Sequence, residues 1–140
     1  KVVLAEEKIE VEFKEENPIY VFADDFYIEQ VVTNYFTNAI KNIMEIDGNK
    51  MIKITIKKSK ELGKLRVAIF NTGKKIEEEN LNRIWTRFYK VDTARTRAKG
   101  GTGIGLALVK AIMTKYNSAY GVKNKKNGVE FYFDIQEAKS

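Results

Sequence analysis

The sequence contains no cysteine and no histidine, and it has a single proline. Without cysteine, neither a disulfide framework nor a thiolate metal site can stabilise the chain. Without histidine, no step that needs an imidazole can use a side chain of this sequence. No apolar run approaches the length of a membrane-spanning helix, and no signal sequence opens the chain.

Length and hydrophobic content set the number of domains. A chain of 140 residues with 44% hydrophobic residues is long enough for one domain with a core and too short for two ordinary ones. We therefore expect residues 1–140 to form a single domain. Because the first residue is Lys1 rather than Met, and the strand-like Val2-Val3-Leu4 follows at once, we expect a piece of a longer protein.

The formal net charge of +6 favours a nucleic-acid or anionic-membrane partner at first sight. One basic cluster, residues 50–66, contains an alternating segment from Ile52 to Lys57, which is typical of a half-buried strand with a solvated lysine face. A second cluster between residues 87 and 99 contains Arg87, Lys90, Arg95, Arg97 and Lys99 against only Asp92. This uneven distribution weakens the nucleic-acid interpretation.

Two asparagines four residues apart, Asn34 and Asn38, lie in a segment with helical periodicity. Apolar residues recur at three- and four-residue spacing between residues 28 and 43, which predicts an amphipathic helix that ends near Ile46. Asn34, Asn38 and Lys41 share the other face of this helix. Two amide oxygens beside an ammonium group suit a magnesium ion with a phosphate chain, although a solvated polar face would show the same pattern.

A glycine-rich segment, residues 100–105, precedes a second periodic segment from Ile104 to Tyr116. Backbone N–H groups at the start of such a helix can hold phosphate oxygens, and the glycines allow close approach. The stretch from Val91 to Gly103 has no periodicity, so we expect a mobile loop there. A flexible loop without a ligand would share the Gly-x-Gly pattern.

The remaining segments predict strands before, between and after the helices. Alternation favours strands at 2–13, 19–22, 51–58, 64–70, 120–123 and 129–135. The acidic run 77–79 favours the start of a short third helix with Leu81, Ile84 and Trp85 on its apolar side. Asp24 and Asp25 are candidate caps of the asparagine-containing helix. These elements predict an α+β domain in which three helices cover one mixed, mostly antiparallel sheet.

The order of the motifs resembles one family. The asparagine-containing helix is followed by Phe70-Asn71-Thr72-Gly73-Lys74-Lys75-Ile76, then by Ile84-Trp85-Thr86-Arg87-Phe88-Tyr89-Lys90, and finally by the segment from Gly100 to Lys110. This succession resembles the N, G1, F and G2 boxes of the ATP-binding domain of sensor histidine kinases, a branch of the Bergerat-fold ATPases. Within that family it looks most like sensors of the vancomycin-resistance type. The resemblance covers roughly residues 20–135 and implies a two-layer sandwich with an ATP lid before the G2 box.

The resemblance also implies the residues of a site. Asn38 would supply its side-chain oxygen to magnesium, Asn34 would order the metal shell or the phosphates, and Lys41 would neutralise charge on the phosphate chain. Asn34, Lys41 and Arg87 are the expected catalytic residues. The expected nucleotide-binding residues are Asn34, Asn38, Lys41, Asn42, Asn71, Gly73, Ile76, Tyr89, Lys90, Arg95, Gly101, Thr102, Gly103, Ile104, Gly105 and Leu106.

Asn34 also bears on the mechanism that the resemblance implies. In water-hydrolysing Bergerat ATPases such as gyrase, the corresponding position is a glutamate that can act as a general base, and an amide cannot accept a proton in that way. ATP would therefore be held for transfer to an imidazole rather than for rapid hydrolysis. Because the sequence has no histidine, the acceptor histidine would lie on a helical hairpin upstream of Lys1. The fragment could then bind ATP but could not phosphorylate itself.

The G1 segment departs from the family pattern. Most relatives have an aspartate that accepts a hydrogen bond from the adenine amino group, where this sequence has Asn71, a weaker acceptor. Lys75 replaces a glycine, and Asn42 stands where many relatives have an aromatic residue that stacks on adenine. We expect weaker ATP binding but not its absence. Glu130, on the strand expected beside Asn71, is a candidate for strengthening the adenine contact, although a glutamate here is more often a surface residue.

These features predict the ATP-binding catalytic domain of a two-component sensor histidine kinase, with ATP and Mg²⁺ as ligands. The expected partners are the phosphoacceptor hairpin, or dimerisation domain, of the same protein and a cognate response regulator. We expect no nucleic-acid partner. We expect contact with a membrane only through the missing upstream part of the parent protein. That protein would be a membrane-anchored bacterial receptor with this domain in the cytoplasm. Three alternatives stay open: a serine-directed anti-sigma-factor kinase of the same fold, a non-catalytic interaction module, and a nucleic-acid-binding domain.

Overall fold

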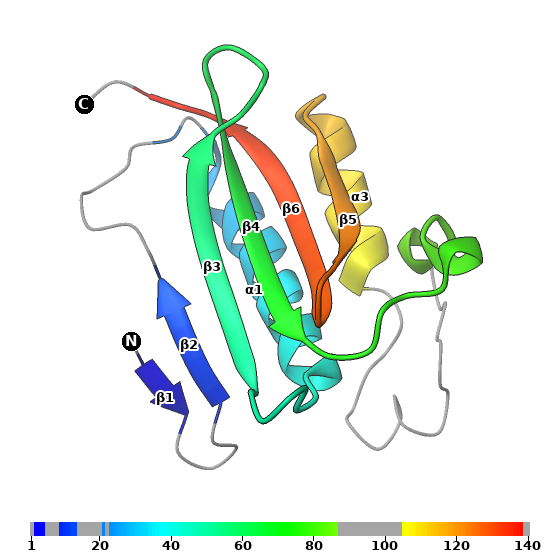
Figure 1. The fold of residues 1–140 in the computed structure, drawn as a ribbon. Coiled ribbons are helices and arrows are strands. Elements are labelled where there is room, and N and C mark those ends of the chain that lie inside the picture. The colour runs from blue at the N-terminus through cyan, green and yellow to red at the C-terminus, as the bar shows by residue number, and fades with distance from the viewer. Residues whose placement is uncertain (1, 5–8, 14–20, 22, 87–104, 139–140) are drawn as a thin grey trace.

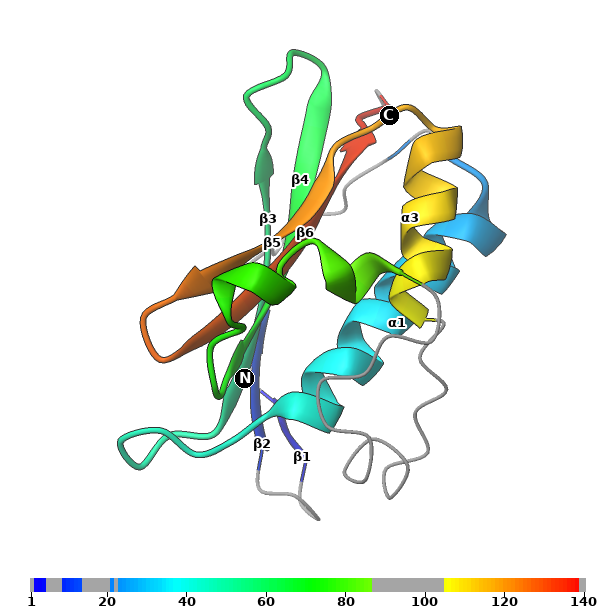
Figure 2. The same ribbon diagram turned by 90° about the vertical axis from the view of Figure 1, so that its right-hand side faces the viewer.

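The structure is a computed structural model that describes residues 2–4, 9–13, 21, 23–86 and 105–138. These residues form a six-stranded sheet with two α-helices, and Figure 2 shows both helices on the same side of the sheet. The strands are β1 (Val2–Leu4), β2 (Ile9–Phe13), β3 (Met51–Lys58), β4 (Lys64–Thr72), β5 (Tyr120–Lys125) and β6 (Gly128–Gln136). The helices are α1 (Asp25–Asn42) and α3 (Gly105–Lys115). This arrangement is the predicted α+β sandwich of two layers.

The sheet is mixed and mostly antiparallel, as predicted. Its strand order is β1-β2-β3-β4-β6-β5 (Figure 1). β2 and β3 run parallel, and the other neighbouring pairs are antiparallel. A parallel pair needs a crossover connection, and α1 lies within the connection between β2 and β3. In place of the single strand predicted at 2–13, the structure has the two strands β1 and β2.

The core lies between the sheet and the helices, where alternate strand residues meet one stripe of each helix. Ile52 on β3 and Ile69 on β4 point to the helices and are almost fully buried. Tyr35 of α1 is fully buried and packs against Trp85, and its hydroxyl donates a hydrogen bond to Tyr132 O at 2.9 Å. Burial raises the pKa of the Tyr35 hydroxyl, so this side chain acts as a neutral donor that ties α1 to β6.

α1 begins at the predicted cap and ends earlier than predicted. Asp24 is the N-cap, and its Oδ1 accepts a hydrogen bond from Phe26 N–H at 2.9 Å. The helix ends at Asn42 rather than near Ile46, because Ile43 adopts an extended conformation and is buried in the core. The next residue, Met44, donates its N–H to Thr72 O at 2.9 Å. The helix therefore ends where the chain pairs with the end of β4.

The short helix predicted after the acidic run takes the form of two 3-10 turns, η1 (Glu78–Asn80) and η2 (Arg83–Trp85). Ile84 and Trp85 are buried, as the apolar side of that segment predicted. Of the strand predicted at 19–22, Val21 is described, and it forms an isolated bridge with Glu137. The loop predicted at 91–103 lies outside the described residues. None of the helices within the described ranges is long and apolar enough to cross a membrane.

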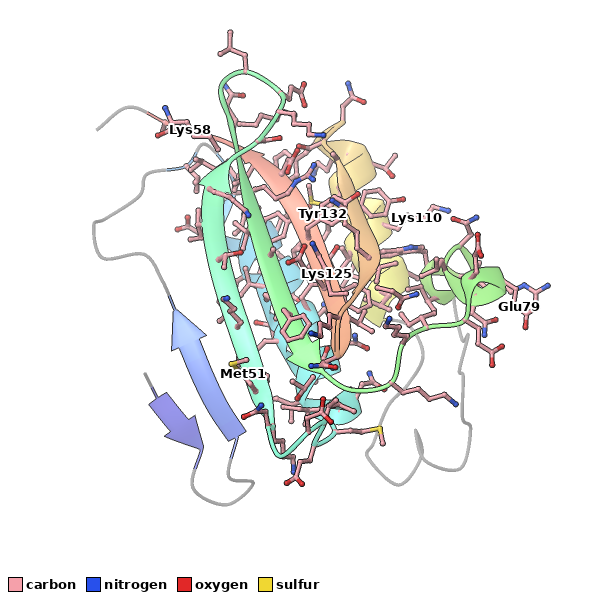
Figure 3. The ribbon with its side chains drawn as sticks, viewed as in Figure 1. Met51, Lys58, Glu79, Lys110, Lys125 and Tyr132 are labelled. Carbon is pink, nitrogen blue, oxygen red and sulfur yellow. The ribbon has the colours of Figure 1, made fainter. Side chains whose placement is uncertain are left out.

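The face of the sheet opposite the helices contains a buried carboxylate. Nε and Nη2 of Arg66 donate to the two oxygens of Asp134 at 2.7 and 3.1 Å, and the Ser59 hydroxyl donates to Asp134 Oδ2 at 2.7 Å. The guanidinium carbon of Arg66 also lies 4.2 Å from the centre of the Tyr132 ring, which projects from this face in Figure 3. Burial alone would raise the pKa of Asp134, but the hydrogen bonds from Arg66 and Ser59 outweigh it and hold the pKa below its usual value.

We expect Asp134→Asn to lower the free energy of unfolding by roughly 2 kcal/mol at neutral pH, because Arg66 loses its charged partner at a buried site. The pKa of the folded carboxyl is lowered, so its contribution is present above the pKa of the unfolded chain and is lost as the pH falls through the folded pKa. Urea unfolding at neutral pH and at about pH 3 should show a difference between the two proteins that shrinks in acid.

The control for this substitution is Glu130→Gln, since the half-buried Glu130 on the same strand pairs with the exposed Lys125, and the nitrogen and oxygen of that pair lie 3.9 Å apart. Such surface pairs contribute little, so this variant should unfold like the unmodified chain. A difference for Asp134→Asn that is as large in acid as at neutral pH would contradict the assigned role of the charge.

Candidate functional site

Asn34 presents its carbonyl oxygen where α1 meets the start of α3. Its amide nitrogen donates to Gln30 O at 2.7 Å, one turn earlier in the helix, and this bond turns Oδ1 away from Gln30. A β-carbon built on Gly105, the first residue of α3, would lie 2.6 Å from Asn34 Oδ1. The oxygen thus occupies the space that a side chain at position 105 would need. Glycine at this position lets the asparagine-containing helix and the end of the glycine-rich segment meet.

α1 and α3 pack side by side in opposite directions. At one end, the Tyr116 hydroxyl just beyond α3 accepts a hydrogen bond from Asp24 N–H at 2.9 Å. At the other end, α3 begins beside Asn34. The first turn of α3 therefore lies next to the polar face of α1, where Asn34, Asn38 and Lys41 are half-buried. The N-terminus of a helix near an ammonium group suits an anion.

The carboxamide of Asn42 donates both to the backbone and to the side chain of Asn38. Asn42 Nδ2 donates to Asn38 O at 2.8 Å and to Asn38 Oδ1 at 3.1 Å. A carbonyl oxygen has two lone pairs, so Asn38 Oδ1 keeps one for a ligand while Asn42 restricts its orientation. Neutral amide oxygens of this kind are suitable ligands for a hard cation such as Mg²⁺. The donor set at positions 34 and 38 therefore fits the predicted metal.

Asn71 lies near the end of β4 on the helix side of the sheet and is 2% exposed. Its Nδ2 donates to Thr72 O at 3.0 Å. No donor from the described part of the chain reaches its Oδ1. The amide is thus held through its nitrogen, and its oxygen is an acceptor of the kind that an adenine amino group requires.

Gly73 brings the end of β4 against the end of α1. A β-carbon built on Gly73 would lie 2.8 Å from Asn42 O and 3.2 Å from Asn71 Nδ2. The N–H of Gly73 donates to Asn127 O at 3.0 Å, which ties this point to the β5–β6 hairpin. Three of the predicted nucleotide-binding positions, Asn42, Asn71 and Gly73, therefore lie together at one end of the site.

We expect Gly73→Ala to lower the free energy of unfolding by about 2 kcal/mol, because the new β-carbon meets the backbone oxygen of Asn42 and the end of β4 must move away from α1. Urea unfolding measures this change. Gly48→Ala is the control: Gly73 and Gly48 both have a positive φ, of 158° and 81°, but Gly48 has open space around its β-position, so it reports the cost of a positive φ alone. Equal losses for the two variants would show that the contact with Asn42 is unimportant.

The suggestion that Glu130 strengthens the adenine contact is wrong. Asn71 pairs with Val129 across β4 and β6, and Glu130 pairs with Phe70. Since neighbouring residues in a strand point to opposite faces, Glu130 lies on the face away from the helices and from Asn71. Its carboxylate is instead 3.9 Å from Lys125 Nζ.

Asn124 makes a contact that the sequence analysis missed. Its Oδ1 accepts a hydrogen bond from Ile76 N–H at 2.9 Å, and its Nδ2 donates to Ile76 O at 2.8 Å. One asparagine in a strand segment produces neither a motif nor a periodic signal. The contact can be recognised only in the folded structure, where β5 lies beside the segment that follows β4. Ile76 and Leu106, two predicted nucleotide-binding residues, are half-buried and pack partly against the core.

Several predicted site residues lie outside the described part of the chain. The catalytic role of Arg87 and the nucleotide contacts of the glycine-rich segment and the basic cluster therefore stay predictions. These positions are Arg87, Tyr89, Lys90, Arg95, Gly101, Thr102, Gly103 and Ile104.

Comparison with known proteins identifies the family of this chain. Residues 23–139 match the family described as histidine kinase-, DNA gyrase B-, and HSP90-like ATPase. The sensor protein VanSB of Enterococcus faecalis is 30% identical over 115 residues, which cover 82% of this chain and 25% of VanSB. The sensor histidine kinase WalK of Bacillus subtilis is 32% identical over 122 residues, which cover 85% of this chain and 20% of WalK. The chain thus spans a quarter or less of the length of these two relatives.

Solved structures share the fold over nearly the whole chain. The catalytic domain of the histidine kinase ThkA is 33% identical with a TM-score of 0.76, and the match covers 92% of this chain and 79% of that domain. ThkA in complex with the response regulator protein TrrA is 29% identical with a TM-score of 0.71, and the match covers 96% of this chain and 36% of that one.

Proposed function

This chain belongs to the histidine kinase-, DNA gyrase B- and HSP90-like ATPase family and is an ATP-binding catalytic domain of the histidine kinase type, and from this we propose that it transfers the γ-phosphoryl group of ATP to a histidine on a separate domain. The observation that carries the proposal is the close approach of Asn34 Oδ1 to Gly105 at the start of α3. It places the polar face of α1 beside a helix end that can receive phosphate oxygens.

The residues around this contact have complementary roles in the proposal. The N–H groups at the start of α3 hold phosphate oxygens, and Lys41 neutralises charge on the phosphate chain. At the other end of the site, Asn71 accepts a hydrogen bond from the adenine amino group through its Oδ1. Holding ATP at both ends fixes the position of the γ-phosphoryl group, and such positioning is the main contribution of a protein to phosphoryl transfer.

Mg²⁺ would be held by Asn38, with Asn34 beside it. No group of three or more acidic side chains in the described ranges could hold a metal ion, so the ion would share its coordination between the amide oxygen and the phosphates. When bound, Mg²⁺ neutralises the charge that builds up on the transferring phosphoryl group. Asn42 restricts the Asn38 carboxamide through its hydrogen bond at 3.1 Å.

Asn34 favours transfer over hydrolysis. Its amide nitrogen is used by Gln30 O, and its oxygen cannot take a proton from water at neutral pH. The site therefore lacks a general base at this position and would hold ATP until an acceptor arrives. Because the sequence has no histidine, the acceptor belongs to another segment or another protein.

The relatives suggest the partners of the parent protein. WalK is a sensor histidine kinase, and ThkA forms a complex with a response regulator protein. We infer that this domain acts with a phosphoacceptor hairpin of its own parent protein and with a cognate response regulator. Since ATP is available in the cytoplasm, we place the domain on the cytoplasmic side of a membrane-anchored receptor.

The test is a phosphorylation assay in which this domain is mixed with the phosphoacceptor hairpin of its parent protein and labelled ATP. The proposal predicts label on the hairpin that is stable to base and lost in acid, as expected for phosphohistidine. Acid-stable label on serine would instead favour an anti-sigma-factor kinase of the same fold. ATP binding without any transfer would favour the non-catalytic module, which the departures at Asn71 and Lys75 motivate.

A further inference from the structure

The segment that leaves β4 has few backbone partners. Between Gly73 and η1 it has no regular secondary structure, and Figure 1 shows it passing along the turn end of the β5–β6 hairpin. Gly73 N–H is held by Asn127 O at 3.0 Å. Lys74 and Lys75 are exposed. Ile76 is the next residue of this segment whose N–H and carbonyl are both paired, and both bonds go to a single side chain.

Asn124 takes the place of a strand neighbour for Ile76. Its Oδ1 accepts from Ile76 N–H at 2.9 Å, and its Nδ2 donates to Ile76 O at 2.8 Å. A carboxamide carries the same donor and acceptor as a peptide group, so this pair reproduces the exchange of bonds seen between strands. β5 is at the end of the strand order, so the segment can lie against it without displacing another strand. We refer to these two hydrogen bonds as the Asn124 clamp.

The Asn124 clamp fixes segment 73–76, which borders the candidate site beside Asn71. Segment 73–76 begins at Gly73, which packs against the backbone oxygen of Asn42 and the amide of Asn71. It ends at Ile76, which packs partly against the core. The β5–β6 hairpin holds both ends, through Asn127 at Gly73 and through Asn124 at Ile76. The conformation of segment 73–76 beside Asn71 therefore depends on the side chain of Asn124, which lies outside all four motifs.

We propose that Asn124 is a positioning residue for nucleotide binding, which keeps segment 73–76 in the shape that receives the adenine end of ATP. This inference rests on the proposed function, because it assumes that adenine binds beside Asn71. Among the described parts of the chain, the Asn124 side chain forms hydrogen bonds with Ile76 and with no residue of α1 that would hold phosphate or metal. The expected effect is therefore on nucleotide affinity and not on the Mg²⁺ requirement.

The test compares Asn124→Ala with Asn124→Asp by hydrogen exchange and by calorimetry. Asn124→Ala removes both bonds, so we expect the Ile76 amide to exchange at least about tenfold faster and ATP to bind roughly fivefold more weakly. The Mg²⁺ concentration at half-maximal binding should not change. Asn124→Asp keeps an acceptor for Ile76 N–H but loses the donor, so the Ile76 amide should stay protected and the ATP affinity should be intermediate.

Gln136→Ala is the matched control, since it also removes a carboxamide and lies exposed at the far end of the same hairpin. It should match the unmodified chain in both measurements. Unchanged exchange at Ile76 in Asn124→Ala would overturn the proposal. Unchanged ATP affinity despite faster exchange, or an affinity loss that comes with a shifted Mg²⁺ midpoint, would overturn it as well.

Separate measurements test the Asn124 clamp and the binding of ATP. Hydrogen exchange is measured without nucleotide, so it reports whether the Asn124 clamp forms whatever the chain binds. If the unmodified chain bound no ATP, the proposed function would be contradicted and the positioning role with it. If the unmodified chain bound ATP and Asn124→Ala bound it equally well, the positioning role alone would be wrong.

Discussion

Gly105→Ala is expected to weaken the binding of Mg-ATP by at least about tenfold while changing the free energy of unfolding by less than about 1 kcal/mol. The added β-carbon would lie 2.6 Å from Asn34 Oδ1, so the Asn34 carboxamide must turn aside. The atom that moves is the end of a side chain, and for this reason the fold survives. The displaced oxygen is no longer available to the phosphates or to the metal shell. Calorimetric titration with Mg-ATP and urea unfolding measure the two quantities.

A double-mutant cycle with Asn34→Ala identifies the cause of this loss. Truncating Asn34 removes the oxygen that the new methyl group would displace. In that background Gly105→Ala should have little further effect on ATP affinity, because the two residues act through one contact. If the losses simply added, the methyl group would be acting on something other than Asn34, and the meeting of α1 with α3 would not be the basis of binding.

Asn38→Ala is expected to slow phosphoryl transfer to the acceptor hairpin by roughly 100-fold. Asn38 Oδ1 is the amide oxygen proposed for Mg²⁺, and alanine leaves that coordination position without a protein ligand. We also expect a higher Mg²⁺ concentration to be needed for half-maximal ATP binding, with nucleotide binding in the absence of Mg²⁺ almost unchanged. Labelled ATP and a titration with Mg²⁺ measure these effects. Asn49→Ala, an exposed carboxamide beyond α1, is the control and should behave like the unmodified chain.

Asn38→Asp separates the oxygen ligand from the charge. Aspartate keeps an oxygen for the ion but brings a negative charge beside the phosphates. We expect transfer to remain impaired and the Mg²⁺ requirement to be lower than in Asn38→Ala. Transfer at the normal rate in both variants would show that Asn38 does not hold the metal.

Elements that bury one face could be predicted from the sequence alone. The period of the apolar residues in α1 predicts the stripe that contains Val31, Tyr35 and Ala39, and all three are buried. The alternation from Met51 to Lys58 gives β3 its bounds, because the isoleucines face the core. Such patterns are readable because each residue's burial is set by its own element.

Features that depend on distant partners could not be predicted. α1 ends at Asn42 because Met44 bonds to the end of β4, and the acidic Asp134 is buried because Arg66 lies opposite it on β4. Neither partner is near in sequence, so local propensity carries no signal for them. For the same reason the register that turns Glu130 away from Asn71 appears only when β4 and β6 pair.

The candidate site divides in the same way. The order of the motifs predicts that Asn34 and Gly105 belong to one site, and the structure brings them into contact. It also brings Asn42, Asn71 and Gly73 together at the other end. The role of Asn124 could not be predicted, because its two hydrogen bonds go to the backbone of Ile76. Every residue type except proline has the same backbone groups, so the sequence at position 76 does not indicate this contact.

Calorimetric titration of the unmodified chain with ATP, with and without Mg²⁺, tests the central claim most directly. The account predicts saturable binding of one ATP per chain that tightens when Mg²⁺ is present, with an affinity limited by the asparagine at position 71. Absence of binding at millimolar ATP, or binding that is indifferent to Mg²⁺, would contradict it.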